Sequence, residues 1–254
     1  MLTHHQQKLI AALQVKKYRQ KYRKFVVEGD KMVAELLRQT RLPVSALFGL
    51  ERWAEEHAAL LAPFLEIFNP VSAGELKKIS GLSTPNGVLA LAELPATLPD
   101  LDLLQTGRCF YLDGLQDPGN LGTILRIADW FGLPAVFCSP DCVDAFSPKV
   151  VQASMGAIFR VHTREIALSD LIAQRPGLPV MGAVLGGDDV FRTVLPDHGL
   201  LVVGNEGRGL GAIAEQLLTH RLTIPRHPRG QAESLNAAVA AGILAAAWCA
   251  PDSR

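Results

Sequence analysis

The sequence has no long hydrophobic run and few cysteines. No apolar run reaches the ~18 residues that a membrane-spanning helix needs. The N-terminal stretch MLTHHQQKLIAALQ lacks the uninterrupted apolar core of a secretory signal peptide. Four cysteines are present, and no second Cys or His pair stands at zinc-ligand spacing beside the closest two, Cys138 and Cys142. We therefore expect a cytoplasmic protein with reduced thiols, no membrane segment and no metal site.

Two common phosphate-binding loops are also missing. The sequence contains neither the Gly-x-Gly-x-x-Gly turn of dinucleotide-binding folds nor the Gly-Lys-Ser/Thr of a P-loop. This absence weakens one interpretation of the chain, that of a generic nucleotide-binding α/β enzyme.

Positive charge is concentrated at the start of the chain, although 25 basic and 25 acidic residues cancel overall. Residues 1–41 hold ten Lys or Arg against three acids, so the remainder is correspondingly acidic. The densest run puts six cations within nine residues, interleaved with Tyr18 and Tyr22: Lys16, Lys17, Arg19, Lys21, Arg23 and Lys24. Clustered cations with aromatic side chains between them predict binding to RNA. The alternative is a solvated helix end.

Apolar patterning predicts an α/β protein of two domains. In the first hundred residues we expect helices over 4–18 and 30–39, and short strands at VSALFGL, FLEIF and GVLALAEL. Ser72 and Glu75 have the spacing of a capping box that opens another helix. The segment 94–107, with two prolines and a glycine, is the expected linker. We therefore divide the chain into residues 1–100 and 101–254.

From Arg108 onward, short β runs alternate with helices. Strands are expected at CFYLDGL, PAVFCS, IFRVH, PVMGAVL, LLVVGNE and RLTIP, with helices between them near 119–131 and 147–156 and a final helix near 234–249. This alternation is typical of a mainly parallel sheet covered on both faces. The final helix is apolar nearly all round, so it is expected to pack inside the domain or against a second copy of the protein.

Three loops at the ends of expected strands carry polar residues. The first follows CFYLDGL, where Asp117-Pro118-Gly119-Asn120 forms a turn before a helix that bears Arg126. The second is Gly204-Asn205-Glu206-Gly207-Arg208-Gly209, and the third runs from Ile224-Pro225 to Ser234-Leu235-Asn236. Taken singly, the first fits an ordinary turn, the second a βα connection, and Ser234 the N-cap of the final helix. In α/β sheets, however, such strand ends are where ligands bind.

The order of these motifs resembles the SpoU/TrmH family of RNA 2′-O-ribose methyltransferases, within the SPOUT superfamily. The resemblance covers about 108–250, and KKYRQKYRKFVVEGDKMVAELL resembles the RNA-binding substrate domain that many members carry. It implies a ribosomal-protein-like N-terminal domain and a catalytic domain whose sheet ends in a trefoil knot. It also implies S-adenosylmethionine as the cofactor, and a homodimer with the final helix at its interface.

The resemblance assigns roles to particular positions. The matching cofactor-binding positions are Gly204, Asn205, Gly207, Ile224, Pro225 and Leu235. The matching functional polar positions are Asn120, Arg126, Glu206, Ser234 and Asn236. In the mechanism proposed for the family, the arginine at the position of Arg126 acts as the base that removes the proton of the 2′-hydroxyl. Because an arginine pKa exceeds ~12, we favour a role in which it grips a phosphate and aligns the 2′-oxygen with the methyl group.

Other assignments remain open at this point. The same fold could methylate a base nitrogen, could act on transfer RNA rather than ribosomal RNA, or could be a non-catalytic RNA-binding protein. Residues 226–233, RHPRGQAE, also form a longer and more basic loop than the family usually has between Ile-Pro and Ser-Leu-Asn.

Overall fold

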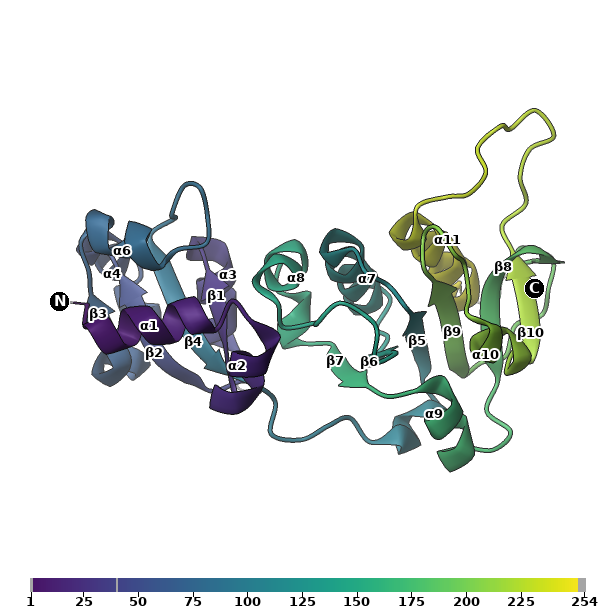
Figure 1. Cartoon of the computed structure of the whole chain (residues 1–254), viewed down its shortest axis with the longest axis horizontal. Coiled ribbons are helices and arrows are strands. Elements are labelled where there is room, and N and C mark those ends of the chain that lie inside the picture. The colour runs from purple at the N-terminus through teal and green to yellow at the C-terminus, as the bar shows by residue number, and fades with distance from the viewer. Residues whose placement is uncertain (1, 40, 251–254) are drawn as a thin grey trace. The chain divides into compact units, whose positions relative to one another are not determined.

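The computed structural model describes residues 2–39 and 41–250, which form two compact units (Figure 1). The N-terminal unit is the described part of Met1–Thr97 together with Asp144–Phe159. The C-terminal unit is Leu98–Val143 together with the described part of Arg160–Arg254. The expected boundary near residue 100 assigns Asp144–Phe159 to the second domain, whereas in the structure this segment packs with the first.

The N-terminal unit contains a four-stranded sheet in the order β1-β4-β2-β3. β4 pairs antiparallel with β1 and β2, and β3 runs parallel to β2. The elements in chain order are α1 (His4–Ala12), α2 (Lys16–Tyr22), β1 (Lys24–Glu28), α3 (Asp30–Arg38), β2 (Val44–Gly49), α4 (Glu51–Glu56), α5 (Ala58–Leu61), the 3-10 helix η1 (Ala62–Ile67), β3 (Phe68–Pro70), α6 (Ala73–Ile79), β4 (Val88–Glu93), α8 (Pro148–Ala153) and the 3-10 helix η3 (Ala157–Phe159). The apolar faces of α1 and α6 pack on the central strands and form the core of this unit.

Side-chain contacts tie the segment Asp144–Phe159 to the rest of its unit. The rings of Phe25 and Phe146 lie 4.9 Å apart, and Arg41 Nη2 donates to the carbonyl oxygen of Ile158 over 2.8 Å. Apolar and hydrogen-bonded contacts of this kind explain why the segment groups with β1 rather than with its neighbours in the chain.

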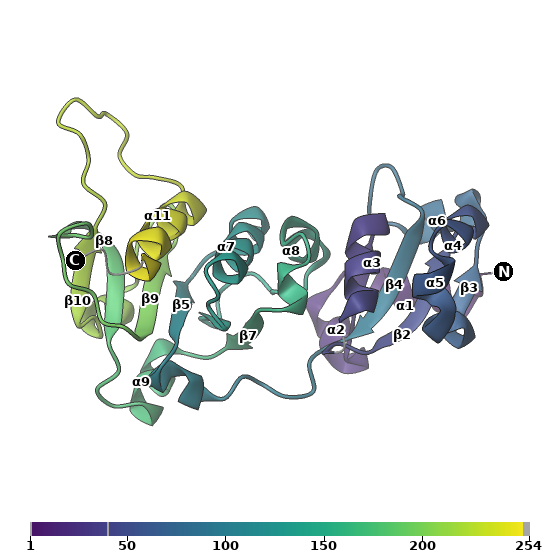
Figure 2. The same ribbon diagram turned by 180° about the vertical axis from the view of Figure 1, so that it is seen from behind.

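The C-terminal unit is a six-stranded sheet in the order β10-β8-β9-β5-β6-β7, and every pairing is parallel. Its elements are the 3-10 helix η2 (Leu101–Gln105), β5 (Arg108–Asp113), α7 (Pro118–Trp130), β6 (Ala135–Cys138), β7 (His162–Glu165), α9 (Leu168–Gln174), β8 (Val180–Asp189), β9 (Gly199–Gly204), α10 (Ala212–Gln216), β10 (His220–Thr223) and α11 (Ala237–Cys249). α7 packs beside α11, and α9 packs beside α10 (Figures 1 and 2). The fully buried central strand β9 is typical of a parallel sheet with both faces covered. This architecture confirms the predicted fold class.

Local signals in the sequence were reliable where a cap or a long apolar run was present. Ser72 and Glu75 form the predicted capping box, and β4 falls within GVLALAEL. The single helix predicted over 4–18 is wrong: it divides into α1 and α2, with an extended Val15 between them. The predicted strand FLEIF is mostly η1, which has a proline in its first turn, and the predicted strand IFRVH begins only at His162. β1 was not predicted.

Every helix within the described ranges is too short or too polar to cross a lipid bilayer. The trefoil knot stays a prediction from the family resemblance.

Candidate active site

Three loops meet at the carboxyl edge of the parallel sheet. β5, β9 and β10 end at Asp113, Gly204 and Thr223, and the motif loops follow these strands directly. Because the strands are parallel, their carboxyl ends lie on the same edge, and this is where α/β sheets bind ligands. The fold therefore brings together segments that are about a hundred residues apart in sequence.

The loop after β9 is shaped by its own backbone. A side chain at Gly204 would come within 2.4 Å of the Gly209 backbone, so only glycine fits there. Asn205 and Gly209 exchange two backbone hydrogen bonds of 3.0 and 2.9 Å. Asn205 Oδ1 accepts from the Gly207 amide, and its Nδ2 donates to the carbonyl oxygen of Gly114 over 2.9 Å. Gly204 and Asn205 thus hold the loop in shape and fasten it to the turn after β5.

That turn is supported by Ser139 and Cys142. Ser139 Oγ accepts from the Gly114 amide over 2.8 Å, and the Cys142 sulfur accepts from the Leu115 amide over 3.3 Å. The hydrogen bond with Cys138 is the main cause that lowers the pKa of the buried Cys142 to about 7. Cys138 and Cys142 are both buried, and Cys142 supports the loop framework through its bond with the Leu115 amide. Among the described residues, no group of His, Cys, Asp and Glu could hold a metal ion.

Asn120, Glu206 and Asn236 form a hydrogen-bonded chain that connects all three loops. Asn120 Nδ2 donates to Glu206 Oε1 over 2.5 Å, and Asn236 Nδ2 donates to Asn120 Oδ1 over 2.9 Å. Asn120 is thus bonded to both the β9 loop and the start of α11. Three of the five predicted polar positions are thus linked, with Asn120 bonded to the other two.

The start of α11 corrects the prediction for Ser234. The helix begins at Ala237, and Asn236 is its N-cap, with Oδ1 accepting from the amides of Ala238 and Val239. A Ser234 cap is therefore wrong, because the segment before Asn236 is not helical. Ser234 instead lines the pocket described next.

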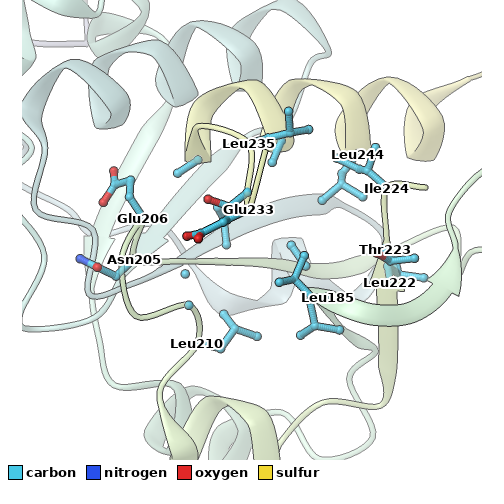
Figure 3. Close-up of a pocket in the computed structure, with 18 of the residues that line it drawn as sticks. Leu185, Asn205, Glu206, Leu210, Leu222, Thr223, Ile224, Glu233, Leu235 and Leu244 are labelled. Atoms are coloured by element: carbon cyan, nitrogen blue, oxygen red, sulfur yellow. The ribbon is translucent and has the colours of Figure 1, made fainter. Parts of the chain in front are cut away.

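A pocket of about 700 Å³ opens between the loop after β9 and the connection from β10 to α11. All six predicted cofactor-binding residues line it: Gly204, Asn205, Gly207, Ile224, Pro225 and Leu235. Figure 3 shows Leu185, Leu222, Ile224 and Leu244 along one side of the pocket. The carboxylates of Glu206 and Glu233 lie on the other side. The pocket suits a ligand that combines an apolar ring with a cationic group.

Several residues of the pocket were missed by sequence reasoning. These are Leu185, Leu210, Leu222, Leu244, Arg208 and Glu233. The leucines belong to strands, a helix and a loop whose apolar residues predicted only core packing. Glu233 stands in a polar loop, so nothing in its spacing distinguished it. The rule that ligands bind at strand ends was the one available signal for the residues after β8 and β10.

Arg126 lies outside the pocket of its own chain. It stands six residues beyond Asn120 on α7, a rise of about 9 Å along the helix. Its side chain is exposed, and within residues 2–39 and 41–250 no hydrogen bond or ion pair engages it. Asp129 pairs instead with Arg160, and Glu206 is bonded to Asn120. A surface ion pair of Arg126 with either acid is therefore not formed.

Most of the predicted RNA-binding cations lie on or beside α2. Lys17, Lys21 and Arg23 are exposed, and Lys16 and Lys24 are partly buried. Tyr18 and Tyr22 are exposed, and their rings stack on each other with centroids 6.3 Å apart.

Arg19 departs from the prediction that it contacts RNA. Its side chain is only 4% exposed, and Nη2 and Nε donate to Asp144 Oδ2 over 2.5 and 2.9 Å. Nη1 donates to the carbonyl oxygen of Leu13 over 2.7 Å. Because these donors bond within the protein, Arg19 is a structural residue that anchors α2. The prediction that Arg19 binds RNA is therefore wrong.

Comparisons with family models and with known proteins indicate the same family. A model of the SpoU rRNA methylase family matches residues 107–246, and a model of the MRM3-like substrate-binding domain matches residues 5–90. The chain is 29% identical over 247 residues to the 23S rRNA (guanosine(2553)-2′-O)-methyltransferase RlmP of Bacillus subtilis, covering 91% of each protein. Some other relatives are longer, and the matched region spans 35% to 64% of them.

Solved structures agree with this result. A TrmH-family structure from Porphyromonas gingivalis is 39% identical, with a TM-score of 0.84 over 98% of each chain. An rRNA methyltransferase from Sinorhizobium meliloti with bound AdoMet is 28% identical, with a TM-score of 0.83 over 98% of this chain and 95% of that one. Since the family model covers more than half of the sequence, this chain belongs to the SpoU rRNA methylase family of RNA methyltransferases.

Proposed function

We propose that this protein transfers a methyl group from S-adenosylmethionine to a ribose 2′-hydroxyl of large-subunit ribosomal RNA. The observation that carries the proposal is the meeting of three motif loops at the carboxyl edge of the sheet, where Asn120 of the first loop bonds to the second and third, and these two line one pocket. The names of relatives such as RlmP support the ribose position and the ribosomal substrate. With ribosomal RNA as the substrate, we place the enzyme in the cytoplasm.

The pocket has the chemistry that S-adenosylmethionine requires. The apolar side, with Leu222, Ile224 and Leu244, suits an adenine ring, and backbone groups of the Gly204–Gly209 loop are available for hydrogen bonds. The carboxylates of Glu206 and Glu233 favour a cationic ligand. The neighbour with bound AdoMet supports the same cofactor. When bound, S-adenosylmethionine supplies an already activated methyl group, so the protein mainly has to align the nucleophile.

Arg126 is assigned to hold the RNA. Its planar guanidinium is free to form a bidentate contact with a phosphate beside the reacting ribose, and this contact would hold the 2′-oxygen in line with the methyl group. Asn120, Glu206 and Asn236 hold the three loops together, and Ser234 and Leu235 lie on the pocket wall. In this assignment alignment is the main catalytic contribution of the protein.

Residues 1–100 are proposed to bind the substrate, and residues 101–254 to catalyse. The match of residues 5–90 to a substrate-binding domain supports this division. The exposed cations of α2, with Lys17 and Lys21 at their centre, provide phosphate contacts.

We also propose a homodimer that covers the outer face of α11. The sequence of this helix, AAVAAGILAAAWC, has no charged residue, and Val239 is 51% exposed. An apolar face of this kind favours burial against another surface. A dimer would also bring Arg126 of one protomer to the pocket of the other, which fits its position outside its own pocket. The trefoil knot of the family is part of this proposal.

Mapping the modified nucleotide tests the function. The purified protein is incubated with labelled S-adenosylmethionine and either ribosomal or transfer RNA from cells that lack the enzyme. We expect label at one nucleotide of large-subunit RNA, and resistance of the adjacent phosphodiester bond to alkali because the 2′-oxygen is methylated. Label on a base, or on transfer RNA alone, would contradict the assignment. Cofactor binding without any transfer would indicate an RNA-binding protein on the same scaffold.

Substitution of Arg126 tests its role. Arg126→Ala should slow single-turnover transfer by about 10²–10³, which corresponds to the ~3–4 kcal/mol that one preorganised donor supplies. Arg126→Lys should fail nearly as badly, because an ammonium cannot form the planar bidentate contact. Calorimetric binding of S-adenosylmethionine should be unchanged in both variants. Near-normal turnover of Arg126→Ala would remove the residue from the mechanism.

Subunit complementation tests the proposed dimer. Arg126→Ala and Ile224→Trp, which fills the pocket, should each be inactive alone. If Arg126 serves the pocket of the other protomer, mixed dimers hold one complete site, and an equal mixture should regain about a quarter of normal activity. A mixture that stays inactive although mixed dimers form would show that Arg126 acts within its own chain. A monomeric mass at micromolar concentration would refute the dimer itself.

A further inference from the structure

The loop Arg226–Glu233 protrudes from the C-terminal unit at the mouth of the pocket. It belongs to the 13-residue connection between β10 and α11, drawn in Figure 1 as the long loop between these two elements. Residues 225–236 are all exposed, so the connection buries little apolar surface. Ordering each residue costs roughly 1–2 kcal/mol, and an ordered loop of about this length without helix or strand is uncommon in a compact domain.

Internal hydrogen bonds give this loop a definite shape. At its neck, Arg226 Nη1 donates to the carbonyl oxygen of Ala232 over 3.1 Å. At its tip, the Gly230 amide donates to the carbonyl oxygen of His227 over 2.7 Å, and the Arg229 amide donates to His227 Nδ1 over 3.1 Å. The side chain of Arg226 also packs against Gly230, where an added Cβ would lie 3.1 Å from its Cγ.

These bonds leave Arg229 as the free cation of the loop. Arg226 is used at the neck, whereas within residues 2–39 and 41–250 no hydrogen bond or ion pair engages the Arg229 guanidinium. The two ends of the loop, Arg226 and Ala232–Glu233, line the pocket, and Arg229 does not. Arg229 is therefore held at the tip of the loop and is not part of the pocket wall.

We propose that the Arg226–Glu233 loop is a substrate clamp, in which Arg229 binds a phosphate of the RNA strand that enters the pocket. The inference rests on the proposed function, because a ribose can reach the pocket only if its own strand passes the mouth. A free guanidinium on a preformed loop suits a phosphodiester. Arg226 and His227 are positioning residues that hold the tip.

RNA binding and methyl transfer are measured separately for Arg229→Glu, Arg229→Ala and Arg229→Lys. Gln231→Ala is the matched control, since Gln231 is an exposed neutral residue of the same loop. Binding is followed by fluorescence anisotropy with a labelled RNA fragment that contains the modified nucleotide, or with single-stranded ribosomal RNA fragments if none is modified. Thermal unfolding confirms that each variant is folded.

We expect Arg229→Glu to raise both Kd and KM for RNA about tenfold, with kcat and the Kd of S-adenosylmethionine within about twofold of normal. Loss of one phosphate contact should reduce the slope of log Kd against log salt by about 0.7–0.9. Arg229→Ala should show a smaller effect, and Arg229→Lys and Gln231→Ala should stay close to the wild type.

Three results would overturn the clamp. The first is an unchanged Kd and salt slope in Arg229→Glu. The second is an equal loss in Gln231→Ala, which would mean that loop shape matters and charge does not. The third is weaker cofactor binding in place of weaker RNA binding. If the wild type binds RNA but methylates none, the proposed enzymatic function fails, and the binding measurements still decide whether Arg229 contacts RNA.

Discussion

Replacing Asn120 by aspartate tests whether the contact between the three loops maintains the pocket. The substitution keeps the size of the side chain and the acceptor oxygen for Asn236, but it replaces the donor to Glu206 with a second carboxylate. The lost hydrogen bond to a charged group is worth about 1 kcal/mol at this exposed position. Repulsion between two exposed carboxylates a few ångströms apart adds about 1 kcal/mol. The β9 loop is therefore destabilised by about 2 kcal/mol.

The expected consequence is weaker cofactor binding. If the pocket needs the β9 loop in its observed position, the Kd of S-adenosylmethionine in Asn120→Asp should rise by up to about 30-fold at pH 8, because 1.4 kcal/mol corresponds to a factor of ten. The carboxyl introduced at position 120 should have a pKa above its ordinary value of about 4, since a neighbouring carboxylate disfavours its charged form. As the pH falls toward 5, this carboxyl gains a proton, can donate to Glu206 again, and should restore part of the affinity.

Asn120→Ala is the control for the pH dependence, because it removes both hydrogen bonds of Asn120 without adding charge. Its affinity should fall by up to about 30-fold, the effect of about 2 kcal/mol, and should not recover at low pH. Isothermal titration calorimetry at several pH values between 5 and 8 gives both results. Wild-type affinity in Asn120→Asp, or the same pH dependence in both variants, would show that the contact does not maintain the pocket.

Two further predictions concern the N-terminal unit. Replacing both Lys17 and Lys21 by glutamate should weaken RNA binding about tenfold or more at low salt, with a smaller effect at high salt, and should leave cofactor affinity unchanged. If the variant binds RNA as tightly as the wild type at all salt concentrations, this surface is ordinary solvated charge. The hydrogen bond from the backbone amide of Ser72, with that from Leu2, lowers the pKa of Glu75 to about 2. The ionised Glu75 carboxylate therefore stabilises the folded state at a pH above about 4.5, its pKa in the unfolded chain, and this stabilisation is lost as the pH falls toward 2. Glu75→Gln should therefore be less stable than the wild type at pH 7, and the difference should shrink by pH 3 in urea denaturation; a constant difference would refute the linkage.

Local features of the fold could be predicted from the sequence, whereas burial of charge could not. The capping box of Ser72 and Glu75 depends on residues three apart, and such a spacing is visible in the sequence. Arg19 shows the opposite case. It stands in a run of six cations, but its partner Asp144 is 125 residues away, and this distance hides the ion pair from any local pattern. A charge run therefore predicts a basic surface without identifying which of its members is buried.

The candidate site was predictable at the level of loops but not of contacts. The rule that parallel strands place their carboxyl ends on one edge predicts that Asn120, Glu206 and Asn236 approach one another. It cannot decide between Ser234 and Asn236 as the cap of α11, because both residue types are good caps. The structure selects Asn236, whose oxygen caps the helix while its amide nitrogen reaches Asn120.

The strength of these contacts bears on how the site is assembled. The bonds from Asn120 to Glu206 and Asn236 are solvent-exposed, so together they contribute about 2 kcal/mol. A cofactor at a hundred times its Kd stabilises the form that binds it by about 2.7 kcal/mol. Because these two free energies are similar, cofactor binding stabilises the arrangement of the loops about as much as the Asn120 hydrogen bonds do. The Arg226–Glu233 loop joins the same framework, because its two ends lie between Ile224 and Asn236. Binding of the cofactor is therefore expected to stabilise the base of this loop, whose tip is proposed to meet the RNA.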